Sequence, residues 1–155
     1  MKVMIISKDP NKQGREKNIL KIVGSFDGDM DIEFYAYGTK NNEMDIDNVT
    51  FIPIWEKYTV NGAIAFSRYI GDSERTVIVF EEGVIPKSIV NILDHHIKGQ
   101  YGITLSLYKK ESDYFACGVY VVEREYLDML SKDRSFESEI CVLCAENGDL
   151  GIFYD

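Results

Sequence analysis

A pair of cysteines spaced as Cys141-x-x-Cys144 is the first motif in the sequence whose residue types could perform chemistry. This spacing occurs in zinc sites and in redox centres. A structural zinc site needs four ligands, however, and only Cys117 and two histidines remain as further candidates. On a helix the two cysteines share a face with Ile140 and Leu143, so we expect them to be buried as small apolar groups.

The sequence Asp94-His95-His96 could supply a metal ligand or an acid–base pair. Adjacent helical residues point about 100° apart, so the two histidines cannot easily bind one ion together. We therefore expect His96 to be packed in the interior and His95 to lie at the surface. No arrangement of Ser, His and Asp indicates a nucleophile.

Charged side chains also follow two apolar runs. The segment 8–17 comes after the run 2–7, is polar and rich in turn formers, and contains Arg15 and Lys17. Glu81 and Glu82 come after the run 76–80. Because open α/β sheets bind ligands beyond the carboxyl ends of their strands, a pocket in this protein should have these four side chains at its rim. The alternative is that the cations are solvated loop residues and the glutamates are exposed turn carboxylates.

Apolar and β-branched runs predict strands, and periodic apolar residues predict helices. The expected strands cover 2–7, 31–37, 49–55, 76–80, 103–108, 115–122 and 150–154, and the expected helices cover 61–70, 86–98, 123–130 and about 136–146. Pro86 suits a first helical turn, Gly99 would end that helix, and Ser135 is a candidate N-cap. Interleaved strands and helices predict one α/β domain over 1–155, a three-layer sandwich around a mixed, mostly parallel sheet.

Composition argues against several classes of function. With 155 residues, 45% of them hydrophobic, the chain is long enough for one well-buried domain. Its net charge of −9 argues against binding DNA or RNA, which needs a basic surface. No apolar run approaches the roughly 20 residues that span a bilayer, and the N-terminus lacks the pattern of a signal peptide. We expect a soluble, cytoplasmic protein with reduced cysteines and with neither a nucleic-acid nor a membrane partner.

Several segments, taken in order, carry a resemblance to one enzyme family. The segments are 17–24 (similar to K-P-L-L-x-I-x-G), 60–64 (T-A-G-A-L), 76–85 (F-L-V-L-N-G-D-V-L), His96 with Lys98-Gly99 (F-H-x-x-K-G-A), 116–122 (N-A-G-I-Y-V-F), Glu125 with Leu127 (E-x-L) and Phe136-Glu137 (F-x-F-E). Together they resemble the sugar-1-phosphate nucleotidylyltransferases, which join a nucleoside monophosphate to a sugar phosphate. The resemblance covers nearly the whole chain and implies a single nucleotide-diphospho-sugar transferase type of domain.

The resemblance weakens at the family's phosphate-binding loop, G-G-x-G-T-R-L-x-P-L-T. The corresponding segment, 7–15, is shorter and has a single glycine. Asp9 is a poor phosphate ligand because of its charge, and Pro10 because it has no N–H group. The resemblance leaves Arg15, Lys17 and Gly62 as the candidate residues for binding a nucleotide or phosphate.

Other departures also fall on residues that the family uses for chemistry. Its metal-binding N-G-D turn is replaced by Glu81-Glu82-Gly83, so either glutamate would have to bind Mg²⁺ in place of the aspartate. Ala116 stands where the family has a sugar-contacting asparagine. The E-K-P segment with its phosphate-binding lysine is absent from the short connection 109–114. Under one alignment Asp155 matches the second metal-binding aspartate.

These departures predict a degenerate nucleotidyltransferase-like domain that binds a nucleotide, sugar phosphate or nucleotide sugar with weak or no transferase activity. The alternative is a non-catalytic interaction or regulatory protein on the same scaffold. An unrelated small α/β protein is a third interpretation. One antiparallel strand in the C-terminal half of the sheet would favour the first two.

Aromatic residues suggest a surface for self-association or for another protein. Strand alternation would turn Tyr35, Tyr37, Tyr58 and Tyr69 partly outward. The missing E-K-P segment and C-terminal extension should also leave Phe115, Tyr120 and Phe153 uncovered, so we expect a homodimer or a complex with another protein.

Overall fold

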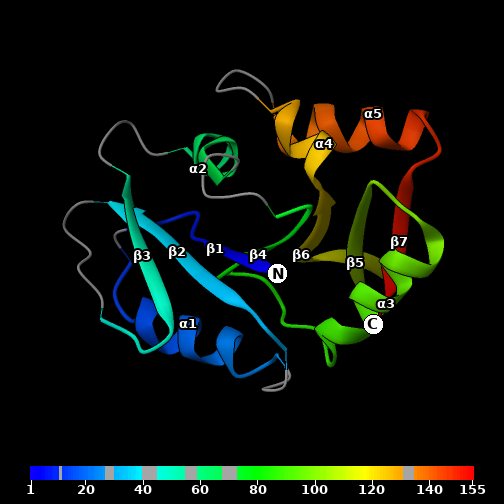
Figure 1. Ribbon diagram of the computed structural model, residues 1–155. Helices are drawn as coiled ribbons and strands as arrows, with labels where there is room; N and C mark the ends of the chain where they lie inside the picture. The colour runs from blue at the N-terminus through cyan, green and yellow to red at the C-terminus, as the bar shows by residue number, and fades with distance from the viewer. Residues whose placement is uncertain (11, 27–29, 40–44, 55–58, 68–72, 131–134) are drawn as a thin grey trace.

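The computed structural model describes residues 1–10, 12–26, 30–39, 45–54, 59–67, 73–130 and 135–155 (Figure 1). The strands are β1 (Lys2–Ile6), β2 (Glu33–Thr39), β3 (Val49–Ile54), β4 (Arg75–Phe80), β5 (Ile103–Lys110), β6 (Asp113–Glu123) and β7 (Leu150–Tyr154). The helices are α1 (Arg15–Val23), α2 (Val60–Ser67), α3 (Ile89–Gly99), α4 (Arg124–Asp128) and α5 (Cys141–Glu146), the last preceded by a π-helical turn, η1 (Phe136–Ile140).

The strands form one sheet in the order β3-β2-β1-β4-β6-β5-β7. Strand β6 is antiparallel to both of its neighbours, and all other adjacent pairs are parallel. The predicted mixed, mostly parallel sheet is therefore confirmed, including one antiparallel strand in the C-terminal half. Strand β1 lies between β2 and β4. After β1 the chain adds β2 and β3 on one side and then continues with β4 on the other side, so the strand order reverses at β1. This is the switch point at which open α/β sheets bind their ligands.

Helices cover both faces of the sheet, as Figure 1 shows. Alternate residues of β1 enter separate cores: Val3 and Ile5 pack with residues of α1 and α3, and Met4 and Ile6 pack with residues of α2, α4 and α5. Because both faces of the central strands are buried, the sequence of β1 is a continuous apolar run. The same burial corrects the expectation for Tyr37 on β2, which is fully buried rather than turned outward.

Several helix boundaries differ from the prediction. Helix α1 begins at Arg15, inside the polar segment 8–17, where apolar periodicity predicts no helix. Helix α3 begins after Ser88, whose hydroxyl accepts the N–H of Asn91, rather than at Pro86. It ends at Gln100, in the left-handed conformation with φ of 53°, rather than through Gly99. The Ser135 cap is confirmed, because its side chain accepts the N–H of Ser138.

Some predictions fall outside the described residues, among them those for Tyr58, Tyr69 and the end of the 61–70 helix at Ile70. In the part of the chain that is described, no helix combines the length and apolar character needed to cross a bilayer.

Candidate functional site

The ends of β1 and β4 bring together the two charged segments that the sequence placed at a pocket rim. The N–H of Glu81 donates to the carbonyl of Ile6 at 2.9 Å, which extends the β1–β4 pairing by one residue. Glu82 then turns its carboxylate toward the end of β1, where it accepts the Ser7 hydroxyl and, at 3.0 Å, the N–H of Lys8. Burial alone would raise the pKa of Glu82, but these hydrogen bonds outweigh it and lower the pKa of the carboxyl.

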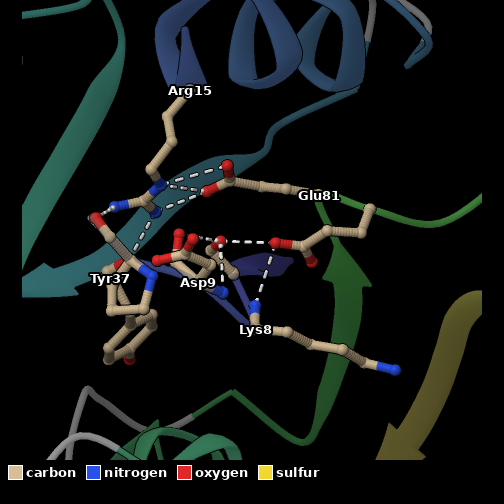
Figure 2. Close-up of polar contacts among 8 residues, drawn as sticks. Lys8, Asp9, Arg15, Tyr37 and Glu81 are labelled. Carbon is tan, nitrogen blue, oxygen red and sulfur yellow. Dashed lines mark hydrogen bonds and ion pairs between the residues drawn. The ribbon is translucent and has the colours of Figure 1, made fainter. Parts of the chain in front are cut away.

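Arg15 and Glu81 form a buried ion pair above the end of β1 (Figure 2). The Nε of Arg15 lies 2.9 Å and 3.0 Å from the two carboxylate oxygens, and Nη2 also contacts Oε1. The remaining donors reach the carbonyls of Tyr37, at 2.6 Å, and Pro10, at 3.3 Å. Burial raises the pKa of the Glu81 carboxyl above its ordinary value, and Arg15 opposes that shift.

This pair corrects the alternative in which both groups face solvent. The side chains of Arg15 and Glu81 are only 2% and 1% exposed. Arg15 is therefore not a solvated loop cation, and Glu81 is not an exposed turn carboxylate. Sequence patterns could not reveal this, because the two residues lie 66 positions apart in the chain.

A cleft formed by two adjoining cavities of about 140 and 170 Å³, both lined by Lys8, Phe80 and Glu137, lies on the face of the sheet that α2 and α5 cover. We call it the Lys8 cleft. The smaller cavity is completed by Glu82, Gly83, Ala116, Gly118 and Tyr120, and the larger by Val60, Asn61, Ile64, Ser135 and Phe136. Among these described lining residues Lys8 is the one cation, and its Nζ lies 5.6 Å from the ring centre of Phe80. The cleft thus presents one ammonium group between two carboxylates.

Tyr120 and Glu137 line the smaller cavity together with Lys8. The tyrosine hydroxyl donates to Glu137 Oε1 at 2.6 Å, and the ring packs edge-on against Phe80 and Phe136. Burial and the neighbouring carboxylate raise the pKa of Tyr120, so it remains a hydrogen-bond donor at neutral pH. Tyr120 is 4% exposed, which corrects its expected place in an uncovered aromatic patch.

The predicted site residues occupy different environments. Glu82 lines the Lys8 cleft, whereas Arg15 and Glu81 bind each other and line neither of its cavities. Lys17 is exposed on α1 and lines neither cavity. Gly62 lies on α2, where its N–H donates to the Thr59 hydroxyl at 3.0 Å.

Sequence reasoning missed four residues of the cleft: Lys8, Asn61, Tyr120 and Glu137. Lys8 had a usable signal, because it directly follows the first strand. Glu137 had one in its match to the F-x-F-E segment. Asn61 and Tyr120 enter the cleft only through the packing of α2 and β6.

Gly83 explains why no aspartate occupies the end of this turn. A Cβ atom on Gly83 would lie 2.1 Å from the carbonyl oxygen of Cys117, far inside van der Waals contact. The approach is close because β6 bends at Gly118, which has φ of 81°. Any side chain at position 83 therefore requires the backbone of β4 or β6 to move.

The motifs proposed for metal or redox chemistry are packed into the interior. Cys141 and Cys144 are buried, and burial raises the pKa of both thiols. His96 is buried as expected, whereas His95 is half-buried against Tyr101 and Phe153 rather than at the surface. Within the described residues, no group of three or more His, Cys, Asp or Glu side chains is placed to hold a metal ion.

No protein-family model matches this chain, and no curated protein sequence matches it. Several solved structures are similar to it. A Bacillus anthracis protein described as a glucose-1-phosphate thymidylyltransferase, in complex with sucrose, superimposes with a TM-score of 0.68 at 10% identity, over 100% of this chain and 87% of that one. HddC from Yersinia pseudotuberculosis, complexed with GMP-PN, gives 0.67 at 9% identity, over 100% and 91% of the two chains.

The 4-diphosphocytidyl-2C-methyl-D-erythritol synthase of Anaerococcus prevotii gives a TM-score of 0.65 at 10% identity, over 99% of this chain and 86% of that one. Identities this low establish the architecture alone. The chain therefore has the nucleotidyltransferase-like fold that its ordered sequence segments predicted.

Proposed function

We propose that the protein binds a nucleotide, a sugar phosphate or a nucleotide sugar in the Lys8 cleft and has weak or no transferase activity. The observation that carries this proposal is the cleft itself. It lies at the carboxyl ends of β1 and β4, beside the switch point of the sheet, and has a lysine at its centre. The ammonium group of Lys8 suits a phosphate, and Asn61, Ser135 and Glu137 suit hydroxyl or base-edge groups.

Two observations support reduced catalysis. The Gly83–Cys117 contact leaves no room for an aspartate at the turn, and Ala116, which lines the cleft, cannot hydrogen-bond a sugar hydroxyl. Losing a metal ligand and a substrate contact each removes transition-state stabilisation.

We propose that Mg²⁺ binds this protein only together with a ligand that carries a phosphate. Mg²⁺ is commonly held by one or two carboxylates and by the phosphates of a substrate. Glu82 lines the cleft, and its Oε1 accepts hydrogen bonds from Ser7 and Lys8. We propose Glu82 as the carboxylate for such an ion in preference to Glu81, whose oxygens are bound to Arg15.

The test is titration of the protein with glucose 1-phosphate, UMP and UDP-glucose while backbone amide NMR shifts are followed. We expect shifts at Lys8, Glu82 and Asn61, and a loss of affinity of about tenfold in Lys8→Ala, because a charge-assisted contact contributes roughly 1.5–3 kcal/mol. Lys17→Ala removes the same charge from exposed α1 and should change affinity less than twofold.

Activity is measured in parallel. With a nucleoside triphosphate, Mg²⁺ and the same sugar phosphate, the protein should release no pyrophosphate above a heat-denatured control. Rapid turnover, or shifts confined to α1 and α3, would contradict the proposal.

A second candidate function is a protein-binding scaffold, and exposed aromatic residues favour it. Tyr114 and Phe115 on β6 are 52% and 46% exposed, and Tyr154 on β7, across β5, is 58% exposed, with Ile152 also on β7. Of the patch expected from sequence, Phe115 is exposed and Phe153 is half-buried against His95. Tyr114, Ile152 and Tyr154 share one face of the sheet, with the ring centroids of the two tyrosines 5.1 Å apart, whereas Phe115 packs against Tyr108 on the other face. We propose that this aromatic patch, Tyr114, Ile152 and Tyr154, mediates a homodimer or contact with another protein. Three unpaired cysteines fit a reducing, cytoplasmic setting for either function.

A further inference from the structure

Strand β7 is the last strand on one side of the sheet, and among the described strands none lies beyond it (Figure 1). At its two ends the carbonyl of Asp149 accepts an N–H group at the start of β5, and the N–H of Asp155 donates to a β5 carbonyl at 2.9 Å. The backbone groups of successive residues in a strand point to opposite sides. The groups that point away from β5 are therefore those of the even-numbered residues, Leu150, Ile152 and Tyr154.

This open edge carries none of the usual protection. A free strand edge can pair with another strand, and proteins commonly prevent this with lysine or proline residues. Strand β7 has the sequence LGIFY and contains neither, whereas β3 at the opposite edge of the sheet contains Pro53. Two copies joined at β7 would leave only their β3 edges free, so pairing would end at a dimer.

The exposed area of the aromatic patch is too small to hold a dimer by itself. Tyr114 and Tyr154 are 52% and 58% exposed, and Ile152 is 39% exposed. Because a whole aromatic side chain buries about 150–250 Å², these three residues add roughly 300 Å² per copy. Two copies would thus bury roughly 600 Å² through the patch, whereas a specific interface needs about 1,000 Å² or more. The edge of β7 adjoins the patch and can supply the remaining contact.

We propose that β7 pairs antiparallel with β7 of a second copy of this chain, about a two-fold axis at Ile152, so that the two sheets become one. In this register Ile152 lies opposite the partner's Ile152, and Leu150 lies opposite the partner's Tyr154. Each outward N–H group then donates to an outward carbonyl of the other copy. The same residues serve on both sides, as a two-fold interface requires. This inference rests on the protein-binding function proposed above and specifies its partner and its contact.

The register has a consequence for the salt dependence of the dimer. It places Asp149 opposite the partner's Asp155, and like charges directly opposite each other oppose association. Salt screens this repulsion. Self-association should therefore become stronger as the salt concentration rises, whereas a basic strand from another protein would bind these acidic ends more weakly at high salt.

The test is disulfide cross-linking of single-cysteine additions. Directly opposite, hydrogen-bonded residues of antiparallel strands have Cα atoms about 5.5 Å apart, which is within the range of a disulfide. Ile152→Cys should therefore cross-link to its own copy. Tyr154→Cys is the matched control, because its two copies would lie four residues apart along the strands, about 13 Å, which is beyond reach. Wild type measures the background from its buried cysteines.

Each protein is checked for folding by circular dichroism, oxidised mildly and separated by non-reducing electrophoresis. We expect a covalent dimer in most of Ile152→Cys and only background levels in Tyr154→Cys and wild type. Equal cross-linking of the two variants, or none in Ile152→Cys, would overturn the inference. Sedimentation equilibrium of wild type at about 0.05 M and about 0.5 M NaCl should show a dimer at least twofold tighter at the higher salt, and a weaker one would count against the register.

The hydrogen bonds themselves are tested with Ile152→Pro, which removes an outward N–H group and leaves the bonds to β5 in place. It should weaken the dimer about tenfold, whereas Ile152→Val should change it less than twofold. Wild type alone judges the self-association proposed above. A wild-type dimer without cross-linking of Ile152→Cys would retain association through the patch and reject the edge pairing, whereas a monomeric wild type would reject both.

Discussion

At the scale of single residues, Gly83 leaves no room for a side chain at the end of β4. Its Cα lies where β4 ends and β6 bends, and the Cys117 carbonyl occupies the space that a side chain would need. Backbone atoms, rather than a competing side chain, therefore exclude an aspartate from this turn. A substitution that adds a side chain here requires movement of a strand.

We predict that Gly83→Asp destabilises the protein by about 2 kcal/mol or more, since overpacking against rigid backbone is at least that costly. It should not produce pyrophosphate-releasing activity. Urea unfolding followed by circular dichroism measures the change. Val84→Asp adds the same charge at a neighbouring position that is 45% exposed, and it should cost less than 1 kcal/mol. Equal stability of the two variants would contradict the steric argument.

At the scale of elements, His96 connects α3 to the sheet through two hydrogen bonds. Its side chain is 1% exposed, with Nε2 2.8 Å from Glu123 Oε1 on β6 and Nδ1 2.9 Å from the Thr104 hydroxyl on β5. Because a carboxylate only accepts, Nε2 carries the proton, and neutral Nδ1 accepts from Thr104. Arg75 on β4 donates to the same Glu123 oxygen, so three strands and one helix meet at this cluster.

Burial lowers the pKa of His96 below its ordinary value of 6.5, although Glu123 opposes the shift. The folded protein therefore keeps His96 neutral at pH values where the unfolded chain binds a proton. The stabilisation is complete above the ordinary value and is lost as the pH falls below it. We predict that the urea midpoint of wild type declines more between pH 7.5 and 5.5 than that of His96→Gln. Parallel declines in the two proteins would show that His96 does not contribute.

At the scale of the whole molecule, the two ends of the sheet differ. At one edge β3 contains Pro53, which lacks an N–H group and so hinders hydrogen bonding of that edge to a strand of another chain. At the other edge β7 has the sequence LGIFY and exposes Ile152 and Tyr154, and the ring of Tyr154 contacts that of Tyr114. An apolar edge of this kind favours association, despite the net charge of −9.

We predict a homodimer through the aromatic patch, burying on the order of 1,200 Å² or more in total. Sedimentation equilibrium at micromolar concentrations should show the dimer for wild type. Tyr114→Ser combined with Tyr154→Ser should give a monomer. Leu20→Ser, at an exposed apolar residue of α1, should leave the dimer intact. A wild-type protein that is monomeric throughout this range would contradict self-association.

Local patterns were sufficient for most of the architecture. Continuous apolar runs predicted β1, β4 and β6, because strands buried on both faces need apolar residues at every position. Helix ends were less predictable: α3 starts at Ser88, where a capping hydroxyl is available, although Pro86 would also suit a first turn. Alternation misplaced Tyr37, because it cannot tell how many faces of a strand will be covered. The missing family segments misplaced Tyr120, because Phe80 and Phe136 pack against its ring in their absence.

The sequence by itself determined the fold, since strand and helix periodicities are local properties and their order along the chain restricts how the elements can pack. It also located the charged residues at the ends of β1 and β4. Only the tertiary structure decided what those charges do. Arg15 and Glu81 are 66 positions apart, and they neutralise each other because β1 brings α1 and β4 to the same end of the sheet. Lys8 lines the cleft together with Glu137 from a distant part of the chain, because contacts between distant segments depend on the assembled sheet and not on any local pattern.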